Sequence, residues 1–418
     1  MMRPVSLLPI LSSCLVVACG EAAQDPAAQD DMSTGVVRDA PDATYAPQRG
    51  DMPPDASDLG SSVTCCDVGA SPQGDDMELD MDSSITDQDA GTQDPPPARC
   101  QPGEERCVDA FPARLTGSTT TSTQSRYDRY ACAPDTDEGG PELLYRLLLD
   151  EPGFLAARLE DLPAGVDVDL HLLLDGQDPD SCLDRGHFSS GAYLEPGEYW
   201  LVVDSWVNAS GESLDGAFAL TMHLNTVESL ERHGLSRAIA EDALVAFASA
   251  WSAEHSRRLE YSITDFSIHS SNPRAWVLDL ATDARLFHTT IGHGIGSIEG
   301  DDRGVSSLFS NVPQSYTSSL GMMRAAETYV GDFGYSMRLD GLEPGFNDNV
   351  RSRDIVVHPD DRNRPEVTQQ QGYLTPSRGC PTLEPDLSRQ LIDTVRDGSL
   401  MFYWYPDMTW RNGSIFLN

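Results

Sequence analysis

A cysteine and a histidine near the C-terminal end of the chain could act together as nucleophile and base. Cys380 lies in the segment Ser377-Arg-Gly-Cys-Pro381, and the preceding cysteine, Cys182, is far away in sequence. The nucleophilic form of cysteine is the thiolate, so a catalytic cysteine needs a neighbouring base or positive charge. His358 closes the apolar run Asp354-Ile-Val-Val-His358, and its short separation from Cys380 would let two adjacent elements bring the pair together. The spacing predicts nucleophilic catalysis; the competing interpretation is a buried structural cysteine and a core histidine.

The turn around the predicted nucleophile has features that such chemistry requires. Gly379 comes directly before Cys380 and permits a tight backbone conformation there. Backbone N–H groups in that turn could bind the oxyanion of a tetrahedral intermediate. We therefore expect this turn to lie beside the end of the buried strand that carries His358.

Helix and strand patterns precede these residues and must position them. Apolar residues recur at helical spacing over 236–253, with Ser236 near the start, which predicts an amphipathic helix packed against the next domain. A long polar loop follows at 292–319, after short strands that are predicted over 260–266, 274–280 and 285–291. These elements belong to a predicted C-terminal domain, 225–418.

Residues 100–224 have a different pattern, in which short alternating runs are separated by turn residues. Strands are predicted over 143–149, 154–159, 166–174, 198–203 and 217–223. Strands at this spacing favour an all-β sandwich. Asp167-Val-Asp-Leu-His-Leu172 and Leu194-Glu-Pro-Gly-Glu-Tyr-Trp-Leu-Val-Val203 resemble the bacterial pre-peptidase C-terminal type of β-sandwich, a module that usually accompanies secreted enzymes.

Four cysteines of this module could form two disulfides. In an exported protein an even set of cysteines indicates a disulfide framework, and four cysteines allow three pairings. Of these we expect Cys100–Cys107 and Cys132–Cys182. The aspartates between 167 and 180 offer oxygen ligands suited to calcium, but such a run is more often a solvated loop, so no metal is assigned.

The N-terminal region reads as an export and anchoring signal. Residues 1–18 have the features of a secretory signal peptide, with Arg3 before an apolar stretch. Val16-Val-Ala-Cys-Gly20 resembles the bacterial lipobox, in which the cysteine, here Cys19, is acylated and becomes the new N-terminus. Residues 19–99 are rich in Asp, Pro, Gln and Ser and are expected to be a disordered acidic linker. We expect a lipid anchor in the cell envelope, at the outer membrane and facing the periplasm.

Charge and composition exclude several classes of function. The formal net charge of −39 at pH 7 repels phosphate backbones, so we expect no nucleic-acid partner. All 28 basic residues are Arg, which excludes Ser-Lys dyads, Schiff bases and phosphate-loop lysines. The histidines are scattered and the sequence contains no His-Glu-x-x-His, so we expect neither a zinc site nor a cofactor.

Eight short motifs occur in order between residues 291 and 381. They are Ile291-Gly-His-Gly294, Phe309-Ser-Asn-Val-Pro313, Ser318-Ser-Leu-Gly321, Leu339-Asp-Gly-Leu342, Gly345-Phe-Asn-Asp-Asn349, Arg351-Ser-Arg353, Ile355-Val-Val-His358 and Ser377-Arg-Gly-Cys-Pro381. Together they resemble the murein L,D-transpeptidase catalytic-domain family in its YkuD-like variant branch, over about residues 260–406. The commoner branch of that family has an apolar residue and Arg after the nucleophile, where this chain has Pro381 and Thr382.

Together, the patterns and the resemblance predict a mainly β chain. Two β-rich domains, a β-sandwich and then an L,D-transpeptidase-like β fold with a few helices, would follow the disordered tether. The resemblance implies that Cys380 is the acyl-accepting nucleophile and His358 its general base. It also implies that Gly379 and Cys380 supply oxyanion amides, and that Ser377 orients the imidazole or the substrate.

The resemblance further implies that the substrates are the stem peptides of peptidoglycan. His293 and Gly294 would contact them, with a structural histidine as an equal alternative. Arg351, Arg353 and Arg378 could pair with substrate carboxylates, because guanidinium groups bind carboxylates bidentately, and at least one of the three is expected to be structural.

The implied reaction is acyl transfer in two steps. Cys380 would attack the carbonyl after the third residue of a stem tetrapeptide, release the terminal D-alanine and pass the acyl group to an amine on another stem. Two alternatives remain open at this point. If water takes the acyl group, the enzyme is an L,D-carboxypeptidase; if the site is degenerate, the chain is a tethered wall-binding lipoprotein.

Overall fold

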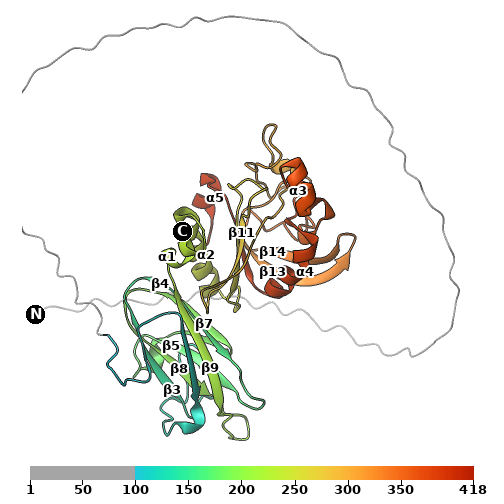
Figure 1. Ribbon diagram of the computed structural model, residues 1–418. Coiled ribbons are helices and arrows are strands. Elements are labelled where there is room, and N and C mark those ends of the chain that lie inside the picture. Colours follow the sequence, from blue (N-terminus) through green and yellow to red (C-terminus); the bar gives the residue numbers. More distant parts are fainter. Residues whose placement is uncertain (1–98) are drawn as a thin grey trace, which may run out of the picture. The chain divides into compact units, whose positions relative to one another are not determined.

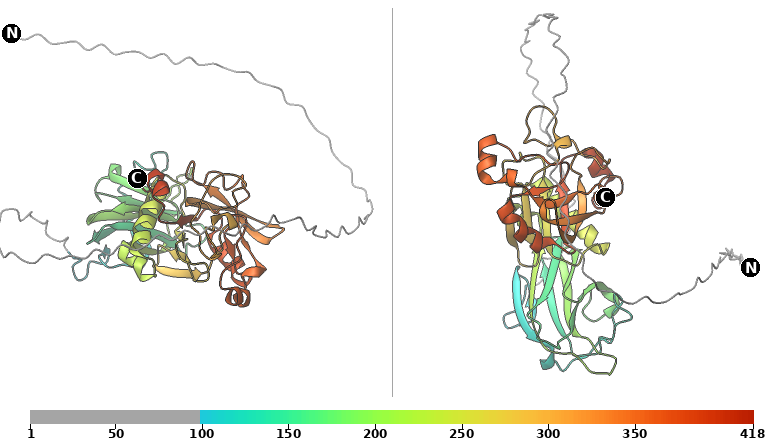
Figure 2. Two further views of the ribbon diagram at one scale, coloured as in Figure 1. Left: turned by 90° about the horizontal axis from the view of Figure 1, so that it is seen from above. Right: turned by 90° about the vertical axis from the view of Figure 1, so that its right-hand side faces the viewer.

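The computed structural model describes residues 99–418, which are coloured in Figures 1 and 2. The predicted signal peptide 1–18, the expected lipidation site Cys19 and the acidic segment up to residue 98 lie outside the described residues. All described residues fall within one compact unit, 88–418. They form three sheets and five α-helices, so the predicted mainly β fold class is confirmed for this part of the chain.

The first part of the described chain is a β-sandwich of two sheets. One sheet has the order β1-β3-β8-β5-β6, with strands Cys107–Val108, Leu143–Leu149, Gly197–Ser205, Val168–Leu173 and Cys182–Gly186. The other has the order β2-β9-β4-β7, with strands Ala113–Ser118, Ala217–Asn225, Gly153–Glu160 and Ser189–Leu194. Short 3-10 turns lie at Thr119–Thr121 and Pro179–Ser181.

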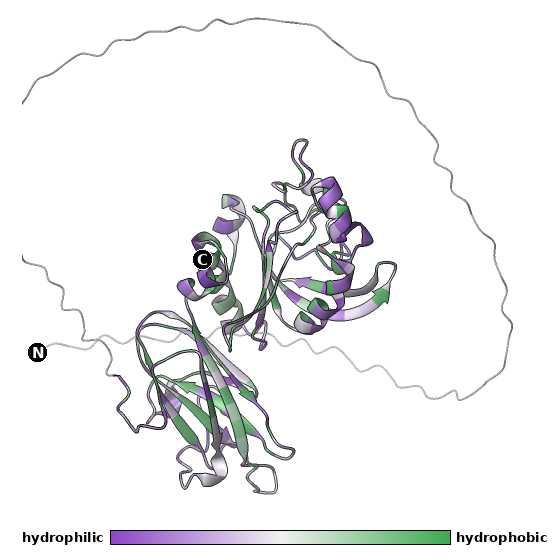
Figure 3. Cartoon of the chain, in the orientation of Figure 1, coloured by the Kyte–Doolittle hydropathy of each residue, from purple (hydrophilic) through white to green (hydrophobic). Residues whose placement is uncertain are grey.

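Alternating apolar side chains on the two sheets form the core of this sandwich. The buried set includes Leu147, Leu170 and Val203 from one sheet and Leu155 and Leu220 from the other, and Figure 3 shows the apolar residues along these strands in green. Full burial of one such side chain contributes about 2 kcal/mol. Outside this core, the four cysteines form two disulfides with the expected pairing, Cys100–Cys107 and Cys132–Cys182.

Two helices follow the sandwich. β9 ends at Asn225, and α1 (Val227–Arg232) begins after Thr226, whose side chain and Ser229 form a capping box. α2 (Arg237–Ser252) occupies most of the helix predicted over 236–253. It buries a wide apolar face that includes Ile239, Phe247 and Trp251, as expected of a helix that packs on both sides.

The third sheet has eight strands, in the order β12-β11-β10-β17-β13-β14-β15-β16. The strands are Ala284–Thr289, Ala275–Asp279, Glu260–Asp265, Leu400–Trp404, Gly321–Gly331, Gly334–Gly341, Val356–Pro359 and Thr382–Leu383. β10 pairs with β17 in parallel and β15 with β16 in parallel, whereas the other neighbours are antiparallel. The predicted loop at 292–319 contains only a 3-10 turn, Ile295–Ser297.

Three helices and a further turn complete this part. They are a 3-10 turn Asp361–Asn363, α3 (Pro365–Gln371), α4 (Pro385–Val395) and α5 (Met408–Gly413). Pro occupies the first turn of α3 and of α4, where its missing N–H costs nothing. α3 ends at Gly372, whose φ of +83° is the left-handed conformation common after a helix. α4 packs on β14 and β15, as Figure 1 shows.

The sandwich and the eight-stranded sheet share one hydrophobic cluster. Phe154 and Ala156 of β4 are fully buried in the same cluster as α2 and the third sheet, and the Phe154 ring makes edge contacts with Phe247 and Trp251. Arg158 of β4 contacts two carboxylates of the third sheet, with N···O distances of 3.2 Å to Glu260 and 2.6 Å to Asp279. Because this contact is both apolar and ionic, we infer that the sandwich is fixed to the sheet and does not hang from a linker.

No helix among residues 99–418 has the length and apolar character needed to span a lipid bilayer.

Candidate active site

Strand pairing brings the predicted base and the predicted nucleophile together. β15 carries His358, and β16 lies beside it in parallel, with His358 opposite Thr382. Cys380 therefore lies two residues before the partner of His358. Neighbouring strands lie about 4.8 Å apart. We therefore expect the imidazole of His358 to reach toward Cys380 directly or through one intervening substrate atom.

The Cys380 thiol is almost buried, with 8% of the residue exposed. Its S–H donates to the carbonyl oxygen of Asp354, at an S···O distance of 3.6 Å. Burial raises the pKa of the thiol above its ordinary 9.0, and the N–H of Val356 and the charge of Arg353 offset only part of that effect. The resting thiol is therefore protonated at neutral pH, and the nucleophile depends on a base to remove its proton.

His358 is arranged as that base. Its Nδ1 lies 2.7 Å from the carbonyl oxygen of Pro359. Because a carbonyl can only accept, Nδ1 carries the hydrogen and Nε2 is left with its lone pair. Burial lowers the pKa of the imidazole below 6.5 and keeps it neutral at physiological pH. Within the described residues no hydrogen bond joins His358 to Cys380, and catalytic contacts of this kind often tighten only with substrate present.

Ser377 shapes the nucleophile turn instead of orienting the imidazole. Its hydroxyl donates to the carbonyl oxygen of Cys380 at 2.7 Å and accepts from the N–H of Gly379 at 3.0 Å. The amide of Gly379 is thus already engaged, contrary to the expectation that it supplies the oxyanion hole. The N–H of Cys380 donates no hydrogen bond within residues 99–418 and is the amide that is free for an oxyanion.

Two glycines allow the nucleophile turn to approach the segment at 292–296. Gly379 has φ of +117°, and a Cβ there would lie 2.7 Å from Cδ1 of Ile355 and 2.8 Å from the carbonyl oxygen of Thr317. A Cβ on Gly294 would lie 2.8 Å from Cα of Gly379. Gly294 also forms an isolated parallel bridge with Ser377. Gly294 therefore supports the turn by its small size, and no side chain is available there to bind substrate.

His293 is placed for structure and not for substrate contact. Its side chain is fully buried, and its Nδ1 accepts a hydrogen bond from Arg274 at 2.8 Å. Burial and the nearby Arg274 charge lower the pKa of His293 to about 3, so the imidazole is neutral. Arg274 is itself fully buried and donates to the carbonyl oxygens of Ile268 and Ile291. Of the two alternatives that the sequence left open for His293, these contacts favour the structural one.

The three predicted arginines have three different environments. Arg351 contacts Glu327 through two hydrogen bonds of 2.8 and 3.0 Å and is also paired with Asp340, so its guanidinium is occupied. Arg353 is half-buried and engages the segment at 310–319, as described next. Arg378 is exposed, with its guanidinium over the ring of Tyr316 at 5.7 Å, and no carboxylate of the described residues pairs with it.

Arg353 holds the segment that lies against the nucleophile turn. It donates to the carbonyl oxygens of Ser310 at 2.7 Å and Thr317 at 2.8 Å, and to the hydroxyls of Ser315 and Ser319. The carbonyl of Thr317 is the group that faces Gly379. Sequence patterns could not reveal this role, because the four partners lie up to 43 positions away from Arg353 in the chain.

The second position after Cys380 explains part of the departure from the commoner sequence pattern. Thr382 is fully buried, its hydroxyl accepts from Nδ2 of Asn363 at 2.8 Å, and its carbonyl accepts from the N–H of Gly292 at 2.8 Å. Asn363 in turn accepts from the N–H of Thr375 at 2.8 Å. Thr382 thus ties the end of the nucleophile turn to Gly292 and Asn363, and it presents no charged group to a substrate.

Two buried residues, Glu343 and Asn347, are held by hydrogen bonds within and just before the motif at 345–349. Glu343 accepts from the N–H of Met322 at 2.6 Å and from the indole N–H of Trp410 at 3.0 Å. Asn347 donates to the carbonyl oxygens of Leu320 and Met322 and accepts from the N–H of Glu343. Because these groups would otherwise be buried without partners, their motif is fixed by hydrogen bonding.

The match to a protein family falls on this part of the chain. Residues 231–404 match the family model described as the L,D-transpeptidase catalytic domain. Over these residues the chain is similar to the L,D-transpeptidase catalytic domain. The match begins within α1 and ends at the last residue of β17. It therefore covers the third sheet and all eight motifs, but not the start of α1 or the C-terminal α5.

Solved structures with similarity to the chain include proteins of the same description. An L,D-transpeptidase of Enterococcus faecium is 14% identical over 35% of this chain and 49% of its own, with a TM-score of 0.21. An L,D-transpeptidase of Mycobacterium smegmatis is 12% identical over 60% of this chain and 82% of its own, with a TM-score of 0.22. A pre-peptidase C-terminal domain of Bacillus anthracis collagenase is 15% identical over 28% of this chain and 92% of its own, with a TM-score of 0.19. The chain spans about half the length of the Enterococcus structure, and a search of curated proteins found no match.

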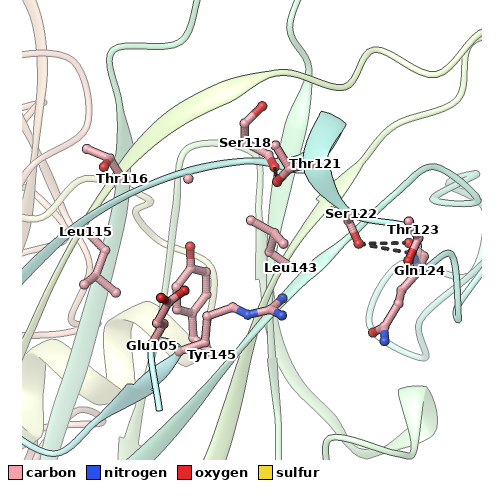
Figure 4. A pocket seen from close by; sticks show the side chains of 12 residues that line it. Glu105, Leu115, Thr116, Ser118, Thr121, Ser122, Thr123, Gln124, Leu143 and Tyr145 are labelled. Carbon is pink, nitrogen blue, oxygen red and sulfur yellow. Dashed lines mark hydrogen bonds between the residues drawn. The ribbon is translucent and has the colours of Figure 1, made fainter. Parts of the chain in front are cut away.

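A cluster of acidic residues and a hollow lie in the sandwich. Asp167, Asp169 and His187 lie close together, but the buried Asp169 already contacts the guanidinium of Arg185 as well as His187. That guanidinium supplies the positive charge that a cation would bring. The pocket in Figure 4 lies in the sandwich, along β2, β3 and the segment at 121–124; its lining is rich in hydroxyls and contains no cysteine or histidine.

Replacing Gly379 with alanine should displace the nucleophile turn. The new methyl group meets Ile355 and the Thr317 carbonyl, so we expect a loss of about 2–4 kcal/mol in the free energy of unfolding and faster alkylation of the Cys380 thiol under native conditions. Gly372→Ala is the matched control, because that glycine also has positive φ but nothing lies within 4 Å of an added Cβ. Urea unfolding and thiol alkylation followed by mass spectrometry measure both effects. Equal effects of the two substitutions would contradict the assigned role of Gly379.

Proposed function

We propose that this protein is a cysteine-dependent peptidoglycan L,D-transpeptidase, in which Cys380 forms a thioester with a stem tetrapeptide and transfers it to an amine. The observation that supports the proposal is the pairing of β15 with β16: His358, with a neutral and Nδ1-anchored imidazole, lies opposite Thr382, two residues after a thiol that needs a base. The family match of residues 231–404 supports the same reaction class.

The first half-reaction follows from the state of the two side chains. Nε2 of His358 takes the proton of the Cys380 thiol as sulfur attacks the carbonyl carbon after the third residue of the stem. The N–H of Cys380 stabilises the oxyanion that forms. The C–N bond to the terminal D-alanine then breaks, and the imidazolium gives its proton to the leaving amine, which leaves a thioester on Cys380.

The second half-reaction returns the enzyme to its starting state. An amine attacks the thioester carbonyl and loses a proton to His358, the C–S bond breaks, and the proton returns to sulfur. The chain has no lysine, so the attacking amine belongs to the substrate and not to this protein. Arg378 is the arginine in place to pair with a substrate carboxylate, because it is exposed, unpaired among the described residues and two positions before Cys380.

Incubation of the purified protein with a disaccharide tetrapeptide should release D-alanine and yield dimers linked through two diamino acids, detected by mass spectrometry. Cys380→Ala should abolish D-alanine release, and His358→Gln should reduce it by about 100-fold or more, the usual contribution of a general base. His269→Gln is the matched control, because the ring nitrogens of that imidazole hydrogen-bond Ser271 and Asp302 and neither Cys380 nor His358. Tripeptide without dimers would identify an L,D-carboxypeptidase. Release of D-alanine that survives Cys380→Ala would refute the proposal, and no release at all would favour a wall-binding protein.

The pH dependence of the acylation step should follow the buried imidazole. Burial disfavours the imidazolium, so His358 stays neutral and able to take a proton at pH values below its ordinary pKa of 6.5. The acid limb of kcat/KM for D-alanine release is therefore expected below pH 6.5, and His358→Gln should remove that limb. A steady-state pH profile measures both. An acid limb centred above pH 7 would show that the imidazole is stabilised in its charged form, contrary to the structure.

We also propose that the chain is exported and anchored by a lipid at Cys19 in the outer membrane, facing the periplasm, as the lipobox-like segment suggests. In a Gram-negative host grown with labelled palmitate, the protein should carry the label and sediment with outer membranes. Cys19→Ser should lose the label and become soluble in the periplasm. Cys14→Ser is the matched control, since that cysteine lies inside the apolar stretch of the signal. Retention of the label in the Cys19 variant would exclude this anchor.

A further inference from the structure

The hollow in the sandwich is not used by the proposed reaction. It lies along β2, β3 and the segment at 121–124, as Figure 4 shows, and has a volume of about 400 Å³. Small-molecule sites in proteins have volumes of roughly 300–1,000 Å³. None of the residues that line the hollow falls within 231–404, the segment that matches the L,D-transpeptidase catalytic domain. A ligand in this hollow would therefore be bound apart from Cys380 and His358.

A nearly buried tyrosine lines this hollow with a hydroxyl that has no partner in the protein. Tyr145 of β3 is 3% exposed, and its ring packs in the core of the sandwich. Within residues 99–418 the Tyr145 hydroxyl makes no hydrogen bond. Burial raises the pKa of Tyr145, so at neutral pH the hydroxyl keeps its proton and can both donate and accept. Because buried polar groups are as a rule hydrogen-bonded, this hydroxyl points to a partner from outside the protein.

A glycine on the facing strand leaves the Tyr145 hydroxyl uncovered. Gly117 belongs to β2 and lines the same hollow. A Cβ at this position would lie 2.9 Å from the Tyr145 hydroxyl oxygen and 2.7 Å from Cζ of Phe218. Glycine inside a strand often marks a place where a ligand or another backbone approaches closely. The lack of a side chain at residue 117 thus keeps the hydroxyl open to the hollow.

The other lining groups are mostly neutral hydroxyls and amides. The side chains of Thr116, Thr123 and Gln124 line the hollow and make no hydrogen bond with another side chain or backbone group of residues 99–418. Three more hydroxyls line it and are engaged within the protein, those of Ser118, Thr121 and Ser122. Leu115 and Leu143 add apolar surface. A hydroxyl can donate and accept, so a matching ligand carries closely spaced groups that do the same beside C–H surface, as a sugar does.

The charged groups of the lining favour a neutral ligand. Glu105 and Arg106 are the charged residues that line the hollow. Among residues 99–418 neither of them takes part in an ion pair, whereas the neighbouring Glu104 is paired with Arg146. One carboxylate and one guanidinium give the lining no net charge, in a chain whose formal net charge is −39. An ionic ligand therefore gains little here, while both groups can form charge-assisted hydrogen bonds with sugar hydroxyls.

We propose that this hollow binds a neutral oligosaccharide, one of whose hydroxyls pairs with the hydroxyl of Tyr145. The free side chains of Thr116, Thr123 and Gln124 bind further sugar hydroxyls, and sugar C–H groups pack against Leu143. The binding is non-covalent and requires no chemistry at Cys380, so it is a separate function of the sandwich. A sugar held here would keep the protein on a polysaccharide whatever reaction the rest of the chain performs.

The test is calorimetric titration of the full chain with three tetrasaccharides: chitotetraose and cellotetraose, which are neutral, and tetragalacturonate, which is anionic. A neutral tetrasaccharide should bind, and more tightly than tetragalacturonate. Tyr145→Phe should weaken its binding about three- to tenfold, the usual effect of one hydrogen bond between neutral groups, with no fall in Tm because the hydroxyl has no partner in the protein. Tyr199→Phe is the matched control: Tyr199 is buried in the same core on neighbouring β8, donates to the carbonyl oxygen of Glu195 at 3.1 Å and does not line the hollow. It should lower Tm and leave binding unchanged.

Three results would overturn the assignment of the hollow. They are failure of both neutral tetrasaccharides to bind at millimolar concentration, tighter binding of tetragalacturonate, and a dissociation constant in Tyr145→Phe that equals that of the parent or of Tyr199→Phe. D-alanine release is measured on the same proteins and should be the same in Tyr145→Phe as in the parent. Absence of that release from the parent would refute the proposed function and leave the sugar site standing, so the two failures are distinguishable.

Discussion

The close approach of two backbone segments is the constraint on which the site depends. A Cβ on Gly294 would meet the Cα of Gly379, and a Cβ on Gly379 would meet Ile355 and the carbonyl of Thr317. This contact fixes the turn that presents Cys380, and Ser377 closes the turn with hydrogen bonds at both of its ends. Arg353 then holds the carbonyl of Thr317 against Gly379 from the opposite side. The nucleophile is thus positioned by backbone packing, and the polar side chains around it mainly serve to keep that packing in register.

Burial has opposite effects on the protonation of the two reactive groups, and together they define the resting state. It raises the pKa of the Cys380 thiol and lowers the pKa of the His358 imidazole, so both groups are neutral at physiological pH. A preformed thiolate–imidazolium pair is therefore not the resting state of this site. In the proposed reaction the proton moves when substrate arrives, and the Nδ1 contact with Pro359 leaves Nε2 as the accepting nitrogen.

The sandwich lies in the same compact unit as the third sheet and packs against it. Phe154 reaches into the aromatic cluster of α2, and Arg158 contacts carboxylates on β10 and β11. Each contact pairs a residue of the sandwich with one about a hundred positions later, which accounts for the compactness of the whole described region.

Sequence alone determined the elements with strong periodicity and the residue types of the site. The alternating runs predicted β3, β4, β5, β8 and β9, and helical spacing predicted α2, because these patterns reflect local burial. The motif order pointed to the same family whose model matches residues 231–404, and Cys380 and His358 stay predicted catalytic residues. Sequence could not reveal the short strands β1, β6 and β16, whose pairing depends on distant partners. Nor could it show that His293 is buried against Arg274 or that Gly379 donates its amide to Ser377. Those roles were decided only by the tertiary structure, because each depends on which distant segment fills the space beside the residue.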